Sequence, residues 1–290
     1  MSATKSTGIR EASLLPVLQR AGYASYQVKE EFFSKRNNVF LLKVERMPQE
    51  KLADSEAVHE IDILASMGLF ETGHDCGHDC GSCHEECAES CAEKQPEEEL
   101  VVWKQYELGD TMYELAMLKL LNNNKLKVPT VLAASDDGIL LQYIEGTNLC
   151  HLFAEAEKNG DYAEDIVLML AGWFKKYYRA TGGKSRGDIN LRNFIYNEHD
   201  GVLYGIDFEN TVFRSAAYDI GDLLAYMVNY EPAFTEWKCE WVRRAAVAFI
   251  MELGLRTDDV RAEYRAALDD LEKRRSVKVP AEIFDILDEI

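Results

Sequence analysis

The sequence predicts an α+β chain of two lobes, a smaller strand-rich lobe over residues 1–144 and a larger helical lobe over residues 145–290. Short apolar runs bounded by polar turns dominate the first half, whereas long stretches of helical periodicity dominate the second. The segment Tyr143–Gly146 joins the two halves and is the expected hinge. At 290 residues and 47% hydrophobic content, the chain is long enough to bury a full core.

The first half is expected to begin with an amphipathic helix at Glu11–Ala21, with Pro16 near its start. Strands are expected at Tyr26–Phe33 and Val39–Val44, because these apolar runs flank the polar turn Ser34–Asn38. Further along, we expect a strand at Leu100–Lys104, a helix at Met112–Leu121 capped by Asp110 or Thr111, and strands at Val128–Ala133 and Gly138–Ile144.

Residues 47–99 interrupt this pattern and are interpreted as an insertion, with helical periodicity at Leu52–Met67 and a cysteine- and histidine-rich, acidic part at 73–99. The cysteines follow the spacing C-x3-C-x2-C-x3-C-x3-C. Thiolate and imidazole groups are preferred ligands of Zn²⁺, so a soft-metal site is one interpretation and an acidic tract without metal is the other. The candidate ligands are Cys76, Cys80, Cys83, Cys87, Cys91, His74, His78 and His84.

The second half is expected to be mostly helical. The helices are expected at 148–157, 161–180, 216–229, 235–253 and 257–275, with short strands at 193–196 and 202–206.

The net charge of -19 argues against nucleic acid and anionic membrane surfaces as partners, since both would be repelled. No apolar stretch approaches the roughly 18 residues that a membrane span needs. The polar start of the chain also lacks the apolar core of a signal peptide, so a cytoplasmic location is expected. In that reducing compartment, clustered cysteines favour metal binding over disulfides.

Three polar residues near the middle of the second half point to phosphoryl transfer: Asp188, Asn193 five residues later, and Asp207 at the end of an apolar strand. This reaction needs a metal ion on the phosphates and a carboxylate that orients the acceptor hydroxyl. Mg²⁺ prefers oxygen ligands, which Asn193 and Asp207 supply, and Asp188 is then the candidate catalytic residue.

Around these residues, the segments Arg186–Ile195 and Tyr204–Glu209 resemble the catalytic loop and metal-binding strand of the aminoglycoside phosphotransferase and choline kinase family, whose pattern is roughly H-G-D-x4-N followed by I-D-F/W-E. Tyr218–Leu223 resembles the downstream helix start, in which Asp219 would brace the loop. The resemblance implies a two-lobed protein-kinase-like fold. Arg186 departs from the pattern, because the family usually has histidine there.

The resemblance also implies a nucleotide site in the first lobe for ATP or GTP with Mg²⁺. Lys104 on its strand and Glu114 on the next helix match the ion pair that binds the α- and β-phosphates. The turn Ser34–Asn38 falls where the phosphate-covering loop belongs, and Ser34 and Asn37 are its candidate donors. Lys43 is a rival for Lys104, with Glu56 or Glu60 as its helix partner.

The expected activity is therefore that of a small-molecule kinase acting on a hydroxyl of an aminoglycoside, sugar or amino alcohol, and the acidic charge suits a cationic substrate. The alternative is a nucleotide-binding regulatory module on a kinase fold with a metal-sensing insertion. The short stretch from Asp207 to Tyr218 disfavours a protein kinase. Candidate acceptor-side residues are Asp222, Glu231, Glu236, Glu240, Trp237 and Trp241, for which solvated helix faces and core packing are the other interpretations.

Overall fold

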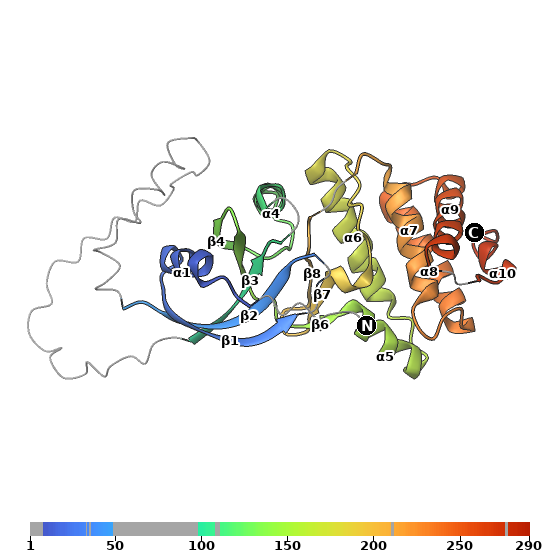
Figure 1. Cartoon of the computed structure of the whole chain (residues 1–290). Coiled ribbons are helices and arrows are strands. Elements are labelled where there is room, and N and C mark those ends of the chain that lie inside the picture. The colour runs from blue at the N-terminus through green and yellow to red at the C-terminus, as the bar shows by residue number, and fades with distance from the viewer. Residues whose placement is uncertain are drawn as a thin grey trace, which may run out of the picture. The chain divides into compact units, whose positions relative to one another are not determined.

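The structure of the chain is a computed structural model that describes residues 8–32, 34, 36–48, 98–107, 111–209, 212–275 and 278–290. It is a mixed α+β fold with a five-stranded sheet and a helical part, as expected (Figure 1). Outside the described residues lie most of the expected insertion with its helix at 52–67, the whole cysteine–histidine tract, and Asp110, Glu56 and Glu60.

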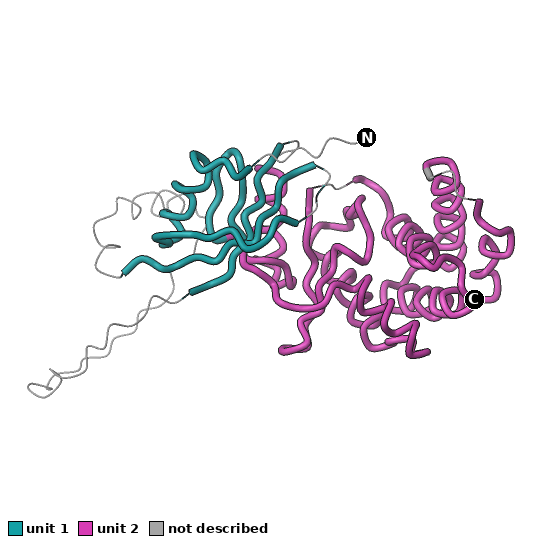
Figure 2. The backbone as a smooth tube through the Cα atoms, turned by 60° about the horizontal axis from the view of Figure 1, so that its bottom comes forward, with its two compact units in different colours: residues 1–107, 132–141 teal, residues 108–131, 142–290 magenta. Residues whose placement is uncertain are grey.

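The chain forms two compact units (Figure 2). The first comprises residues 1–107 and 132–141, and the second comprises residues 108–131 and 142–290. The chain therefore passes between the units three times rather than once, and the helix that follows the lysine strand belongs to the second unit.

Among its described residues, the first unit has one helix and the five-stranded sheet, with strand order β1-β2-β3-β5-β4. Strands β1 and β2, and β2 and β3, pair antiparallel. The fourth strand starts at Val131 and not at Val128 as predicted, because Pro129 has no backbone N–H to give to a ladder. The elements are α1 (Glu11–Arg20), β1 (Tyr23–Phe32), β2 (Asn38–Arg46), β3 (Glu98–Gln105), β4 (Val131–Ser135) and β5 (Gly138–Gln142).

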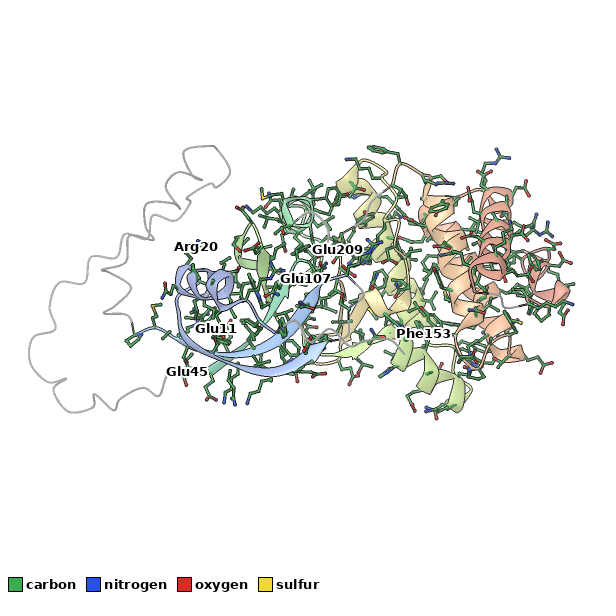
Figure 3. The ribbon with its side chains drawn as sticks, in the orientation of Figure 1. Glu11, Arg20, Glu45, Glu107, Phe153 and Glu209 are labelled. Carbon is green, nitrogen blue, oxygen red and sulfur yellow. The ribbon has the colours of Figure 1, made fainter. Side chains whose placement is uncertain are left out.

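Helix α1 covers the sheet with its apolar face. Leu14, Val17 and Leu18 are buried in a core with side chains of β2, β3 and β5. Pro16 lies inside this helix rather than near its start. An interior proline costs about 3 kcal/mol, but burying an aliphatic side chain contributes roughly 1.5–3 kcal/mol, so three buried residues outweigh it. At the end of the helix, Arg20 donates to the Ala134 carbonyl at 2.7 Å (Figure 3).

The second unit is mainly helical. Its small sheet has the order β6-β7-β8. The short helix α10 was not predicted, because four residues are too few to show periodicity. The elements are α4 (Thr111–Asn123), β6 (Thr147–Asn148), α5 (Leu149–Asn159), α6 (Glu164–Thr181), the 3-10 turn η1 (Leu191–Asn193), β7 (Phe194–Asn197), β8 (Val202–Gly205), α7 (Ala216–Asn229), α8 (Glu236–Leu253), α9 (Thr257–Arg275) and α10 (Ala281–Phe284).

Aromatic side chains fill much of the core of the second unit. Trp173 on α6 meets the edge of Phe194 at a centroid distance of 5.1 Å. Phe153 on α5 packs on Trp241 of α8 at 4.4 Å (Figure 3). Ser215 and Thr235 cap the starts of α7 and α8 by accepting backbone N–H groups. Among the described helices, none is both long and apolar enough to cross a membrane.

Candidate active site

The loop between α6 and β7 carries Asp188, and a single buried carboxylate fixes its first part. Asp219, in the first turn of α7, is fully buried. It accepts hydrogen bonds from the Ser185 hydroxyl at 2.6 Å, the Arg186 N–H at 2.7 Å and the Gly187 N–H at 3.4 Å. The Tyr178 hydroxyl also donates to it, at 2.9 Å. Asp219 therefore braces the loop, as the family pattern implied.

Asp188 follows directly and presents an exposed side chain. The Asn193 amide donates to the Asp188 carbonyl at 3.3 Å, and the Asn190 amide donates to its carboxylate at 3.4 Å. Gly187, just before, has a φ of +80°, a conformation that L side chains rarely adopt. The loop thus bends at a glycine, and Asn193 closes it behind Asp188.

Strand β8 brings Asp207 beside this loop. The Ile206 N–H donates to the Asn193 carbonyl at 2.9 Å, so the end of β8 is hydrogen-bonded to the end of the loop. Asp207 comes next with an exposed side chain and a φ of +66°. A left-handed conformation costs a non-glycine residue of order 1–3 kcal/mol, and the surrounding contacts must enforce it.

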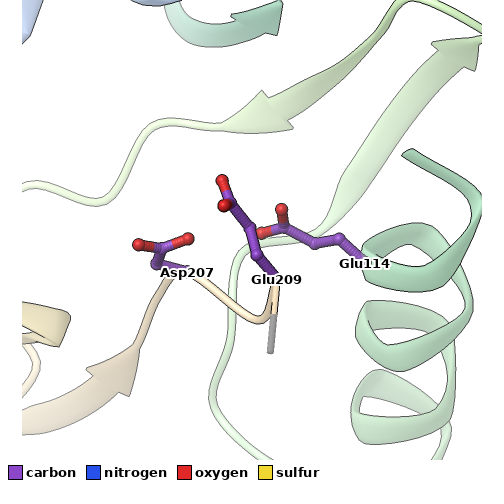
Figure 4. Close-up of side chains that lie close together, drawn as sticks. All are labelled: Glu114, Asp207 and Glu209. Atoms are coloured by element: carbon purple, nitrogen blue, oxygen red, sulfur yellow. The ribbon is translucent and has the colours of Figure 1, made fainter. Parts of the chain in front are cut away.

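Asp207 belongs to a group of three carboxylates (Figure 4). One oxygen from each of Glu114, Asp207 and Glu209 lies within 4.8 Å of the others. Glu114 is buried on α4 and accepts the Phe208 N–H at 3.1 Å. Carboxylate oxygens at this spacing suit a hard divalent cation such as Mg²⁺. Glu209 was not singled out from the sequence, although it closes the Asp207-Phe208-Glu209 motif and that position was the available signal.

Arg186, the departure from the family pattern, is buried and points to the same strand end. Its guanidinium donates to the backbone carbonyls of Ile206 and Asp207, the latter at 3.2 Å. Burial lowers the pKa of Arg186, and Tyr177 and nearby carboxylates oppose that shift. An arginine at this position therefore links the loop that carries Asp188 to the segment that bears Asp207.

Of the predicted nucleotide-binding residues, Lys104, Ser34 and Asn37 lie in the first unit, and Glu114 lies in the second. Lys104 on β3 is buried, and its amine lies 5.5 Å from the ring centroid of Tyr106. The rival Lys43 on β2 is partly exposed and forms an ion pair with Glu98 at 2.5 Å. Lys104 and Glu114 belong to different units, and their pairing stays a prediction.

The predicted phosphate-covering turn joins β1 and β2. The Asn37 N–H donates to the Ser34 hydroxyl at 3.3 Å. The Asn37 side-chain oxygen accepts the Glu107 N–H at 3.2 Å. The turn is thus built on polar side chains, as its sequence suggested, while its role toward phosphate stays a prediction.

The acidic candidates of the helical part differ from one another. Glu240 forms ion pairs with Arg243 and Arg244 on its own helix, so its charge is already balanced. Asp222 lies one turn after Asp219 on α7, and burial raises its pKa to about 6, with Arg274 opposing the shift. Asp219, Asp270 and Asp188 add to the rise of the Asp222 pKa.

The two tryptophans of α8 pack within the second unit. Trp241 is buried, and Trp237 stacks on Tyr162 at 5.5 Å with an interplanar angle of 5°. The packing interpretation therefore holds for Trp241.

No family model matches the sequence, and no curated protein matches it either. Solved structures do. One is the amicoumacin kinase hAmiN in complex with AMP-PNP, Ca²⁺ and Ami, with 12% identity, coverage of 97% of this chain and 94% of that chain, and a TM-score of 0.51. The fold is protein-kinase-like. A Plasmodium vivax ethanolamine kinase also matches, with 9% identity, coverage of 91% of this chain and 81% of that chain, and a TM-score of 0.48.

Proposed function

We propose that this chain transfers the γ-phosphate of ATP or GTP to a hydroxyl group of a small molecule. The observation that carries the proposal is the joining of two segments that each present an exposed carboxylate. Asp188 and Asp207 lie on backbone that is linked through the Ile206–Asn193 hydrogen bond and through Arg186. Phosphoryl transfer depends on such positioning far more than on covalent help from the protein.

The residues have separate roles in this reaction. Asp188 orients the acceptor hydroxyl and accepts its proton. Asp207 and Asn193 are the proposed Mg²⁺ ligands, and Glu209 lies close enough to Asp207 to contribute a third oxygen. When bound, Mg²⁺ would neutralise charge on the β- and γ-phosphate oxygens. The carboxylate group around Asp207 fits this ion, because hard cations prefer oxygen donors.

On the nucleotide side, we propose Lys104 as the phosphate-binding lysine, with Glu114 as its partner and Ser34 and Asn37 in the covering turn. Lys104 occupies strand β3, the strand that bears the equivalent lysine in protein kinases. Lys43 is the weaker candidate, since it lies on β2, whereas Lys104 lies on β3, the strand that directly precedes α4 and Glu114.

On the acceptor side, we propose a cationic molecule of the aminoglycoside or amino alcohol class over a neutral sugar. Asp222 supports this choice, because it lies one turn after Asp219 on α7 and carries a carboxylate with which an ammonium group would pair. A bound ammonium group would favour the ionised form of Asp222 and offset the repulsion from the other carboxylates. The cytoplasm remains the expected compartment.

A coupled assay for ADP or GDP release tests the proposal. The purified chain is offered amine-bearing acceptors and neutral polyols, with Mg²⁺ and either nucleotide. We expect turnover with an amine-bearing acceptor and a loss of about 10²- to 10⁴-fold in Asp188→Asn, as for other positioned acid–base groups. Asp200→Asn is the control, because Asp200 accepts only local hydrogen bonds in the β7–β8 turn.

Two results would contradict the proposal. One is Asp188→Asn with an unchanged rate. The other is tight binding of nucleotide and Mg²⁺ without release of nucleoside diphosphate for any acceptor, which would favour the regulatory module instead.

A further inference from the structure

Arg186 is a buried cation in an aromatic cage. Its guanidinium carbon lies 4.8 Å from the ring centroids of both Phe194 and Phe208 and 5.5 Å from that of Trp173. Its side-chain Nε and Nη1 have no hydrogen-bond acceptor among the described residues. The ring faces lie where acceptors would otherwise be, and they attract the cation through their quadrupoles.

The polar contacts of Arg186 are directed at one place. Its Nη2 donates to the carbonyls of Ile206 and Asp207, at the point where the chain turns into the left-handed conformation of Asp207. The backbone N–H of Arg186 itself is held by Asp219. A continuous path of hydrogen bonds, buried at Asp219 and part-buried at Asp207, therefore runs from α7 through Arg186 to the backbone of Asp207.

The carboxylate of Asp207 is not used by Arg186. The two hydrogen bonds go to backbone carbonyls, whereas a carboxylate oxygen of Asp207 lies within 4.8 Å of oxygens of Glu114 and Glu209. The cation therefore contacts the backbone of Asp207, whereas the carboxylate of Asp207 belongs to the three-carboxylate group.

We propose that Arg186 is a positioning residue that holds Asp207 in its left-handed conformation and so aims its carboxylate at the metal that accompanies the nucleotide. This inference rests on the proposed function. A planar guanidinium suits the task, because its Nη2 donates to two consecutive carbonyls while its flat faces lie against aromatic rings, and a lysine ammonium has no such flat face.

A purely structural role makes a different prediction. If Arg186 only fills the aromatic cage, its replacement lowers the thermal midpoint, and the folded fraction binds metal as before. If Arg186 positions Asp207, the folded variant requires more metal.

The test measures Mn²⁺ binding to the full chain with AMP-PNP by electron paramagnetic resonance, together with the Mg²⁺ dependence of turnover. Arg186→Gln, Arg186→Lys and Arg186→His are compared with wild type. Arg243→Gln is the matched control. Arg243 lies on α8, and its side chain also donates to a backbone carbonyl, that of Ile286, at 3.1 Å. Circular dichroism identifies the variants that fold, and the titrations use those.

We expect Arg186→Gln to raise the metal concentration for half-saturation at least tenfold and to lower kcat more than it changes the KM of the acceptor. Arg186→His, which restores the residue usual in the family, should recover more metal affinity than Arg186→Lys. Unchanged metal binding in the folded Arg186→Gln variant overturns the inference, and so does an equal effect of Arg243→Gln.

The Mn²⁺ titration also separates this inference from the proposed function. Metal and AMP-PNP binding that weakens in Arg186→Gln, in a chain that turns over no acceptor, supports the positioning role and contradicts the kinase activity. Normal turnover with unaltered metal dependence in the variants supports the kinase activity and contradicts the positioning role. A wild-type chain that binds no Mn²⁺ with AMP-PNP overturns both.

Discussion

The loop that carries Asp188 in the second unit and the β1–β2 turn of the first unit are built in contrasting ways. In the loop, the buried Asp219 receives hydrogen bonds from three consecutive residues, and the buried Arg186 extends this set to Asp207. In the turn, neutral amide and hydroxyl groups of Ser34, Asn37 and Asn38 make part-buried or exposed hydrogen bonds, two of them with Glu107.

The difference follows from what each segment is proposed to do. Groups that act on the transferring phosphate must be preorganised, and buried charge with satisfied hydrogen bonds gives that rigidity. A segment that covers the nucleotide has to admit and release it, and neutral polar contacts near the surface suit that task. Substitutions in the two units should therefore have different consequences for stability and for activity.

The largest effect is expected for Asp219→Ala. Its removal leaves the buried N–H groups of Arg186 and Gly187 without their acceptor, which should lower the free energy of unfolding by about 3–5 kcal/mol. Activity should fall at least as far as in Asp188→Asn. Urea denaturation measures the free energy of unfolding, and the coupled assay measures the activity. Asp200→Asn, which removes an acceptor in an exposed turn, should cost about 1 kcal/mol or less. Equal costs for the two would contradict the contrast between buried and exposed anchoring.

A smaller effect, confined to activity, is expected for Lys104→Met. Loss of a phosphate-binding cation should lower kcat/KM for the nucleotide by about 10²- to 10³-fold, as for other groups that stabilise transition-state charge. Lys43→Met is the matched control on the neighbouring strand. It removes an ion pair with Glu98 that is partly exposed, worth about 0–1 kcal/mol, and should leave kcat/KM within about twofold. The opposite ranking in the assay would make Lys43 the phosphate-binding lysine.

The smallest effect is expected for Asp222→Asn, and it depends on pH. Because the folded-state pKa of Asp222 is raised to about 6, the folded protein keeps this proton when the unfolded chain has lost it. As the pH rises from about 4 to 6, the ionisation of Asp222 therefore lowers the free energy of unfolding progressively. Asp222→Asn should remove that decline and be more stable than wild type at pH 7 by about 1–3 kcal/mol.

Urea denaturation at a series of pH values tests this. Glu155→Gln is the control, since Glu155 forms only an exposed pair with Lys158 and should change stability by less than about 0.5 kcal/mol. A wild-type minus Asp222→Asn difference that is constant across pH 4–7 would contradict the raised pKa.

Much of the fold follows from local patterns in the sequence. The helix over residues 216–229 was predicted with the bounds that α7 has, and the helix over 257–275 with those of α9. Both are long and have clear periodicity. Errors occurred where local signals compete, as at Pro129, or where a segment is very short, as at α10. The sequence has no local signal that the α4 segment belongs to the second unit. That membership depends on which elements α4 packs against in the folded chain.

By itself, the sequence determined the succession of strands and helices, and it singled out Asp188, Asn193 and Asp207 as candidate site residues. Both follow from periodicity and motif spacing, which are local properties of the chain. Only the tertiary structure decided that Glu209 and Glu114 lie beside Asp207, and that Arg186 donates to the Asp207 carbonyl from within an aromatic cage. These contacts join residues from separate helices and strands. Burial and hydrogen-bond geometry in the folded chain bring them together, and residue spacing alone does not encode them.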